Sequence, residues 1–189
     1  MKRKRVLTVL AAGLVVVVAA SLYWFQPWKL WVNETVQEAS PVAQTSAEST
    51  TEPSTEVSTG VPKNASPAPK EPVVVATGEL ISHEHATSGS VRILRAADGS
   101  LVLRLENLDT SNGPDLRVWL TDAPVLPGKD GWFVFDDGEH VSAGKLKGNK
   151  GSQNYTLPAG VDPARYSSVT IWCDRFNVSF GAAALTKSA

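Results

Sequence analysis

Residues 167–180 read Ser-Ser-Val-Thr-Ile-Trp-Cys-Asp-Arg-Phe-Asn-Val-Ser-Phe, and this stretch decides the character of the folded part of the chain. Two apolar sets alternate along it with opposite parity: Val169, Ile171 and Cys173, then Phe176, Val178 and Phe180. Alternation with period two is the pattern of a strand with one buried face. A tight hairpin or a β-bulge at Asp174-Arg175 would return both sets to one inner face, so two neighbouring strands are expected here.

Cys173 is the only cysteine in the sequence. One thiol cannot close a disulfide within the chain, so Cys173 is a buried structural residue, a reactive thiol or a ligand. Its place beside the expected turn predicts a semi-buried position near solvent. Arg175 close by would favour the thiolate, whereas burial would oppose it.

The N-terminus combines a basic tip, residues 1–5, with an uncharged stretch, residues 6–25. At ~1.5 Å per residue, a helix of this length spans about 30 Å, the thickness of the bilayer hydrocarbon. Residues 6–25 are therefore interpreted as a transmembrane signal anchor, with the N-terminus cytoplasmic and the domain extracytoplasmic in a single-pass cell-membrane topology. The alternative is a signal peptide with a weak cleavage site at Ala19-Ala20-Ser21.

Residues 26–73 form a juxtamembrane segment that is first aromatic and then rich in Ser, Thr, Pro and Glu. Between residues 33 and 72 there is no aromatic residue, Leu or Ile. Such a composition cannot bury enough apolar surface to offset the entropy of ordering, so a disordered stalk is expected.

Residues 74–185 are predicted to form one all-β, β-sandwich-like domain, followed by a tail at 186–189. Short alternating runs are separated by Gly, Pro, Asn and Asp clusters, which is typical of strands and turns. The clearest unit is a hairpin around Ala97-Asp98-Gly99. A three-residue loop there pairs Arg95 with Leu101, Ile93 with Leu103 and Val91 with Leu105, and so places the apolar residues on one face.

Further elements follow from the same pattern. Residues 115–121 are expected to be a strand with Leu116, Val118 and Leu120 inward, and residues 140–146 and 154–157 two more strands. Residues 132–135 are too short and apolar to be other than a buried strand or a loop plug. Trp119, Trp132 and Trp172 are interpreted as core or rim aromatics.

The sequence gives only weak evidence for a metal site, a hydrolytic site or a nucleic-acid interface. His83 and His85 would share one strand face and are weak metal candidates, with a solvated strand end as the favoured interpretation. The polar run 136–140 lacks the ligand spacing of a calcium loop. No Ser-His-Asp order or paired carboxylates indicate hydrolysis, so no enzymatic activity of its own is expected. The net charge of -1 and the absence of a basic block in the domain argue against a nucleic-acid partner.

Several motifs occur in a fixed order, and together they are specific: 85–91 (HATSGSV), 103–109 (LRLENLD), 112–120 (NGPDLRVWL), 146–149 (LKGN), 151–155 (GSQNY) and 171–181 (IWCDRFNVSFG). In this combination the chain resembles the DM13 domain, the "electron transfer DM13" family, over about residues 75–185. The resemblance implies redox transfer at the cell surface by a free thiol or a bound prosthetic group such as haem, centred on the cysteine matched by Cys173.

The sequence limits the kinds of redox chemistry that the domain could perform. Covalent haem attachment needs Cys-x-x-Cys-His, which is absent, and the only Met available to a blue-copper site is Met1. Exchange between two thiols needs a second cysteine. The favoured hypothesis is an electron-transfer accessory that acts through Cys173, with a redox partner protein at the cell surface and Arg175 as thiolate stabiliser. The alternative is a non-catalytic adhesion or interaction module with a structural cysteine.

Overall fold

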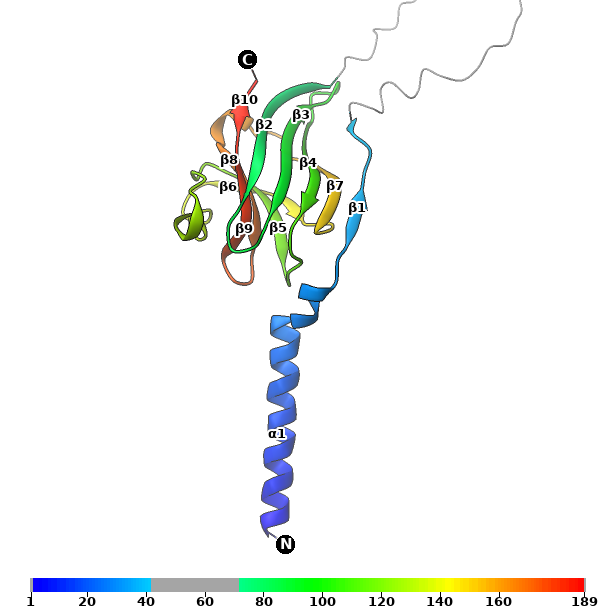
Figure 1. The fold of residues 1–189 in the computed structure, drawn as a ribbon, viewed down its shortest axis with the longest axis vertical. Helices are drawn as coiled ribbons and strands as arrows, with labels where there is room; N and C mark the ends of the chain where they lie inside the picture. The colour runs from blue at the N-terminus through cyan, green and yellow to red at the C-terminus, as the bar shows by residue number, and fades with distance from the viewer. Residues whose placement is uncertain (1, 42–71, 189) are drawn as a thin grey trace, which may run out of the picture.

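The computed structural model describes residues 2–41 and 72–188 (Figure 1). A long helix, α1 (Lys2–Phe25), is followed by a short 3-10 helix, η1 (Pro27–Trp31), and by strand β1 (Thr35–Gln37). Among the described residues, α1 is the helix long and apolar enough to cross a membrane. Figure 1 shows α1 extending away from the β-domain, with its C-terminal end next to the domain.

The domain is built from nine further strands and two 3-10 helices. In chain order these are β2 (Val73–Ser82), β3 (Ser88–Arg95), β4 (Leu101–Asp109), β5 (Leu116–Thr121), η2 (Gly128–Gly131), β6 (His140–Lys145), β7 (Lys150–Thr156), η3 (Pro163–Arg165), β8 (Ser168–Cys173), β9 (Val178–Ala184) and β10 (Thr186–Lys187).

These strands form one sheet in the order β1-β7-β4-β3-β2-β9-β8-β5-β6, and β10 adds to β2. Strand β2 belongs to both halves, because its first part pairs with β3 and its last part with β9. The sheet curls about β2, so that its two halves enclose a core. The predicted all-β class is confirmed.

The register of the β3–β4 hairpin is confirmed residue by residue. Arg95 pairs with Leu101, Ile93 with Leu103 and Val91 with Leu105. Gly99 has a φ of 85°, the left-handed conformation that a three-residue loop requires and that glycine adopts without strain.

Other expected strands appear with shifted bounds. β5 has its three predicted inward residues in the core, whereas β7 begins at Lys150, four residues before the predicted start at 154. Residues 132–135 form no strand. Phe135 is fully buried and plugs the loop, as one of the two expected alternatives, whereas Phe133 is exposed.

Two apolar clusters lie on opposite faces of the β5–β8–β9 half. The inner core lies between the two halves of the sheet and includes Val91, Leu103, Val118 and Ile171. The outer cluster consists of Trp119, Ala123, Phe135, Trp172 and Ala182, with Val125 and Val134 packed against it. The loop between β5 and β6 covers this second face, so β8 is buried on both sides.

Residues 33–40, predicted to begin a disordered stalk, are instead attached to the edge of the sheet. β1 pairs in parallel with β7, which places Val36 opposite Gly151. A Cβ at Gly151 would lie 2.1 Å from the carbonyl oxygen of Val36, so only glycine permits this approach. The remainder of the predicted stalk, residues 42–71, lies outside the described residues.

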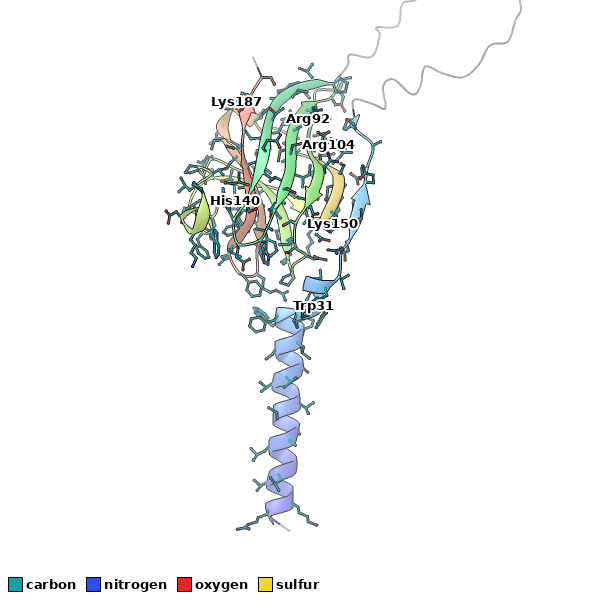
Figure 2. All side chains as sticks on the ribbon, viewed as in Figure 1. Trp31, Arg92, Arg104, His140, Lys150 and Lys187 are labelled. Carbon is teal, nitrogen blue, oxygen red and sulfur yellow. The ribbon has the colours of Figure 1, made fainter. Side chains whose placement is uncertain are left out.

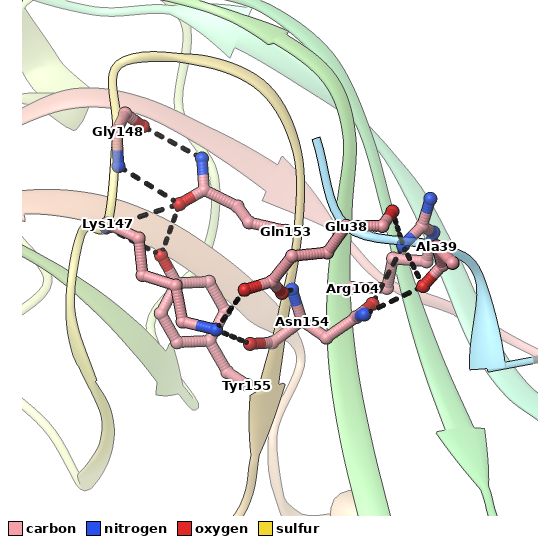
Figure 3. Close-up of polar contacts among 8 residues, drawn as sticks. All are labelled: Glu38, Ala39, Arg104, Lys147, Gly148, Gln153, Asn154 and Tyr155. Atoms are coloured by element: carbon pink, nitrogen blue, oxygen red, sulfur yellow. Dashed lines mark hydrogen bonds and ion pairs between the residues drawn. The ribbon is translucent and has the colours of Figure 1, made fainter. Parts of the chain in front are cut away.

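Polar side chains hold this attached segment in place (Figure 3). The Glu38 carboxylate accepts hydrogen bonds from Lys147 Nζ at 2.7 Å and from the Asn154 backbone amide at 2.6 Å. The buried Arg104 guanidinium donates to the carbonyl oxygens of Glu38 and Ala39, each at 3.2 Å. The hydrogen bond from Lys147 holds the pKa of Glu38 below its usual value. Backbone pairing and charge-assisted bonds therefore replace the apolar burial that this segment lacks.

A chain that begins at Val73 should be less stable than one that begins at Asn33, although sequence composition alone predicts equal stability. The shorter chain loses β1 and leaves the Arg104 guanidinium without two of its acceptors. We expect its thermal midpoint to be roughly 5–10 °C lower in differential scanning calorimetry.

Two substitutions in the longer chain provide the matched test. Glu38→Ala should lower the midpoint, whereas Glu34→Ala should not, because Glu34 contacts the sheet through its backbone N–H and carbonyl. Equal midpoints for the two chain lengths would show that β1 adds no stability.

Candidate functional site

Cys173 ends β8, and its side chain is fully buried in the inner core. It pairs with Leu116 of β5 and with Val178 of β9. The semi-buried position predicted from its place beside a turn is therefore wrong. The reason is that the Asp174 amide donates to the carbonyl oxygen of Asp115, which closes the end of the strand pair over the sulfur.

Burial raises the pKa of the Cys173 thiol, and the negative charge of Asp115 adds to the rise. The backbone N–H groups of Phe176, Arg175 and Asp115 oppose it, because they donate towards the sulfur. Burial is the largest of these effects, so the thiol stays protonated at neutral pH. A protonated, buried thiol is a poor nucleophile.

Arg175 was predicted to stabilise a thiolate, but its guanidinium points elsewhere. Its Nη1 donates to the backbone carbonyl oxygens of Trp24 and Tyr23, and the group lies 5.2 Å from the Trp24 ring centroid. The last carbonyls of a helix have no partner inside it, so Arg175 caps α1. Only the backbone amide of Arg175 acts on the sulfur.

Two features of the chain account for the change of apolar parity between Cys173 and Val178. Residues 174–177 form the hairpin turn, in which Asn177 has a φ of 49°, and the register shifts again between Ile171 and Trp172. Val178 and Phe180 return to the inner core as predicted. Phe176 does not: it is exposed, and its ring stacks on that of Phe25 at a centroid distance of 5.9 Å.

On the outer face of β8, aromatic rings form a continuous stack. Trp172 is fully buried, and its ring centroid lies 5.1 Å from that of Trp119 on β5. Trp119 in turn stacks on His140 at 4.1 Å, with only 13° between the ring planes. His140 is exposed at the start of β6, and Figure 2 shows it on the flank of the domain, away from Trp31 at the junction with α1. The stack therefore runs from the surface to the residue that precedes Cys173.

The β5–β6 loop closes over this stack. Phe135 meets Trp172 edge to face at 6.4 Å, and the His83 ring stacks on Phe135 at 5.7 Å. His83 bonds to Ser179 Oγ at 2.8 Å and to the Leu126 carbonyl oxygen at 3.1 Å, so both ring nitrogens have partners. Burial lowers the pKa of His83. A neutral, fully bonded imidazole here fastens the covering loop to the sheet.

His83 and His85 do not share a face, so this basis for a metal site is wrong. His83 lies against Phe135 in the outer cluster, whereas the His85 ring packs on Phe180 at 3.9 Å. The strand ends at Ser82, so period-two alternation no longer applies to these residues. Within residues 2–41 and 72–188, no group of three or more His, Cys, Asp and Glu side chains is arranged to hold a metal ion.

Thiolate-ligated haem does not fit at Cys173. The sulfur is enclosed by the core, and the pocket of about 290 Å³ at the end of α1 does not have Cys173 in its wall. A porphyrin needs space towards the upper end of the roughly 300–1,000 Å³ found for ligand pockets.

Sequence reasoning missed the stack as a unit, although it named both tryptophans as core or rim aromatics. Each lies opposite in parity to the inner-core residues of its strand, Trp119 to Val118 and Trp172 to Ile171. That parity predicts one shared face only when β5 and β8 are known to be neighbours, and this pairing joins residues about fifty positions apart.

Residues 79–185, which are more than half of the 189-residue chain, match the family described as "Electron transfer DM13". The matched range contains the stack and Cys173, and it leaves out α1 and β1. No curated protein and no solved structure matches the chain.

The burial of Cys173 predicts its reactivity. In the native chain, a small alkylating reagent should modify the thiol at least about 100-fold more slowly than in the denatured chain, because exposure requires local opening that costs several kcal/mol. Mass spectrometry of chains quenched over time gives both rates. Comparable rates with and without denaturant would show that the thiol is accessible.

Proposed function

Because the chain belongs to the electron transfer DM13 family, we propose that it is a membrane-anchored component that passes single electrons at the outer face of a cell membrane. The observation that carries this proposal is the stack of His140, Trp119 and Trp172. It joins the surface of the domain to the residue before the family's cysteine. In this function the domain carries electrons between partners and needs no substrate chemistry of its own.

The contacts at the end of α1 support an uncleaved anchor. The aromatic residues around this end are largely exposed, Tyr23 by 73% and Trp31 by 78%, as expected of side chains that lie at a membrane interface. Arg175 caps the last turn of α1, and Phe176 stacks on Phe25. A cleaved chain would leave these aromatic rings in water. Four basic residues at the N-terminal end of α1, ahead of its apolar stretch, favour a cytoplasmic N-terminus.

The geometry of the tryptophan pair suits transfer of an electron between rings. Indole is among the side chains most easily oxidised by one electron, and stacked rings at 5.1 Å bring the two π systems into contact. An oxidant that docks near exposed His140 would remove one electron from Trp119. Trp172 would then reduce the Trp119 radical cation and hold the electron vacancy inside the domain.

The indole N–H groups add a second argument. Among the described residues, Nε1 of Trp119 and Nε1 of Trp172 are buried and have no hydrogen-bond partner. An oxidised indole is a strong acid, but here no neighbouring acceptor takes the proton. The radical cation therefore keeps its proton, and the electron can return without proton transfer. A buried N–H group without an acceptor lowers the stability of the folded chain. This cost is a reason to seek a function for the two unpaired indole N–H groups.

Cys173 enters the proposal as a buried one-electron donor next to Trp172 in the chain. The thiol would give one electron to the Trp172 radical cation and its proton to Asp115, leaving a thiyl radical and neutral Trp172. Asp115 Oδ1 is buried and accepts no hydrogen bond within the described residues, and its charge already acts on the thiol. Disulfide exchange has no part in this scheme.

One observation favours a second candidate function. Cys173 is fully buried among aliphatic side chains, as a purely structural cysteine would be. If the tryptophan pair carries no electrons, the domain is a non-catalytic adhesion or interaction module presented by the anchor.

The proposed topology predicts the products of proteolysis. Protease added to intact cells or spheroplasts should digest the domain and leave a small membrane-bound fragment that contains α1. Immunoblotting against tags at both ends of the chain gives the readout. A domain that stays protected until the membrane is permeabilised would contradict the outer location.

The tryptophan pair predicts a radical that can be assigned. In a chain with Trp24, Trp28 and Trp31 replaced by Phe, photogenerated ruthenium(III) tris-bipyridine should produce a tryptophan radical cation, seen by transient absorption and electron paramagnetic resonance. Trp119→Phe should lower its yield several-fold because the entry point is lost. Cys173→Ala should lengthen its lifetime because the internal donor is lost.

Trp132→Phe is the matched control, because Trp132 also has an indole N–H without a partner but lies outside the stack. It should leave yield and lifetime unchanged. Equal yields in the Trp119 and Trp132 variants would exclude the stack as the electron path and favour the interaction module.

A further inference from the structure

A pocket of about 290 Å³ lies where the end of α1 meets the domain. Phe25 and Pro27 contribute the wall from the anchor side, and Phe176 and Phe180 contribute the wall from the β8–β9 hairpin and β9. The pocket thus exists only because the anchor and the domain are held together. Its position at the outer end of α1 would place its mouth in the headgroup region of a membrane.

Three sets of contacts keep the two walls at a fixed separation. Phe25 stacks on Phe176 with 16° between the ring planes, and Arg175 holds the carbonyls of the last turn of α1. Asn112, which also lines the pocket, donates to the Val32 carbonyl oxygen at 3.1 Å. β1 then fixes the chain to β7 a few residues later. These contacts make the pocket a built feature of the fold.

Polar groups converge on the pocket from both walls. His85 Nε2 lies 2.7 Å from Glu84 Oε2, and the imidazole packs on the Phe180 ring. Lys29, on the anchor side, also lines the pocket, and its ammonium group forms no ion pair with another described side chain. One side therefore offers a hydrogen-bond donor, and the other an imidazole coupled to a carboxylate.

This combination selects one class of ligand. Apolar aromatic walls fit a flat ring better than a sugar, which needs many hydrogen-bonding groups. An anionic phosphate would be repelled by the Glu84 carboxylate, whereas a neutral ring with oxygens on opposite edges meets Lys29 at one and the His85–Glu84 pair at the other. The mouth at the membrane admits a ligand whose hydrocarbon tail stays in the bilayer.

We propose that this pocket binds the ring of a membrane-soluble quinone or quinol. The inference rests on the proposed membrane anchor and deepens the proposed redox function, because it names the donor. A bound quinol, in place of the Cys173 thiol, would give one electron to the Trp172 radical cation and one proton to the His85 imidazole, which leaves a neutral semiquinone, neutral Trp172 and imidazolium paired with Glu84. Phe180 in the pocket wall is next in the chain to Ser179, which pairs with Trp172, so the paired strands β8 and β9 connect the two sites.

Photoaffinity labelling of the full chain tests the binding directly. The chain is placed in phosphatidylcholine nanodiscs with a short-tailed azidoquinone, illuminated, digested and mapped by mass spectrometry. We expect saturable labelling of peptides that contain Phe25–Lys29 or Phe176–Phe180. An unlabelled short-tailed quinone should compete, whereas phosphatidylglycerol should not.

Paired variants locate the site. Phe176→Ala and His85→Leu should each weaken labelling about 5- to 10-fold, because a stacking contact or a hydrogen bond to the ring is lost. Phe133→Ala is the matched control, at an exposed position outside both the pocket and the stack, and it should leave the labelling unchanged. Thermal midpoints of all three variants show which remain folded. If Phe176→Ala separates α1 from the domain, the labelling of the His85→Leu variant still tests the site, because His85 lies on the domain wall of the pocket.

The outcomes separate binding from electron transfer. Labelling spread along α1, equal competition by phosphatidylglycerol, or labelling unchanged by His85→Leu overturns the quinone site. Pocket-specific labelling without any tryptophan radical supports the site and contradicts the proposed electron path. A radical that forms and is not quenched by added quinol, with no pocket labelling, supports the path and removes the quinone as its donor.

Discussion

The burial of β8 on both faces is the constraint on which the rest of the structure depends. Its inner residues, Ile171 and Cys173 among them, pack between the halves of the sheet, while Trp172 on the other face needs the β5–β6 loop as a cover. A register shift of one residue would exchange Cys173 and Trp172 between two clusters of different size. The positions of the polar residues on the outer face of β8 are also fixed. Ser168 Oγ donates to the Ala123 carbonyl oxygen at 2.7 Å, and the hydroxyl groups of Thr170 and Ser179 are hydrogen-bonded at 2.8 Å. Position on this strand is therefore fixed by packing and by hydrogen bonding together.

The sequence predicted those features of the fold that depend on the local alternation of apolar and polar residues. The β3–β4 register followed from apolar parity and one glycine, and β5 followed from the same rule. The position of Cys173 did not follow from the sequence, because nearness to a turn does not imply nearness to solvent. Whether a strand end is exposed depends on what packs over it. Here that is the backbone at Asp115, which comes from a segment far away in the sequence.

The attached β1 segment could not be predicted for a different reason. Its contacts are made by backbone groups and by Glu38, which are compatible with a Ser/Thr/Pro/Glu-rich composition usually typical of disorder. The partner residues, Arg104 and Asn154, lie on strands that only the fold brings to this edge. The direction of the Arg175 side chain was missed likewise, because its acceptors are backbone carbonyls of a helix about 150 positions earlier.

The attachment of β1 to β7 changes which parts of the molecule the long segment after β1 connects. A stalk between the anchor and the domain would hold the domain away from a membrane. Because β1 already joins the end of α1 to β7, residues 42–71 connect β1 to β2 within one sheet, and the β8–β9 hairpin stays beside the end of α1. Under the proposed redox function, the core, which excludes water, has two approaches of different character. One is aromatic and adjoins α1 at Phe176, and the other is the polar flank at His140. In the proposed function, a domain fixed in this orientation accepts electrons from a membrane-soluble donor and presents them to a water-soluble partner, whereas a freely tethered domain would have no such polarity.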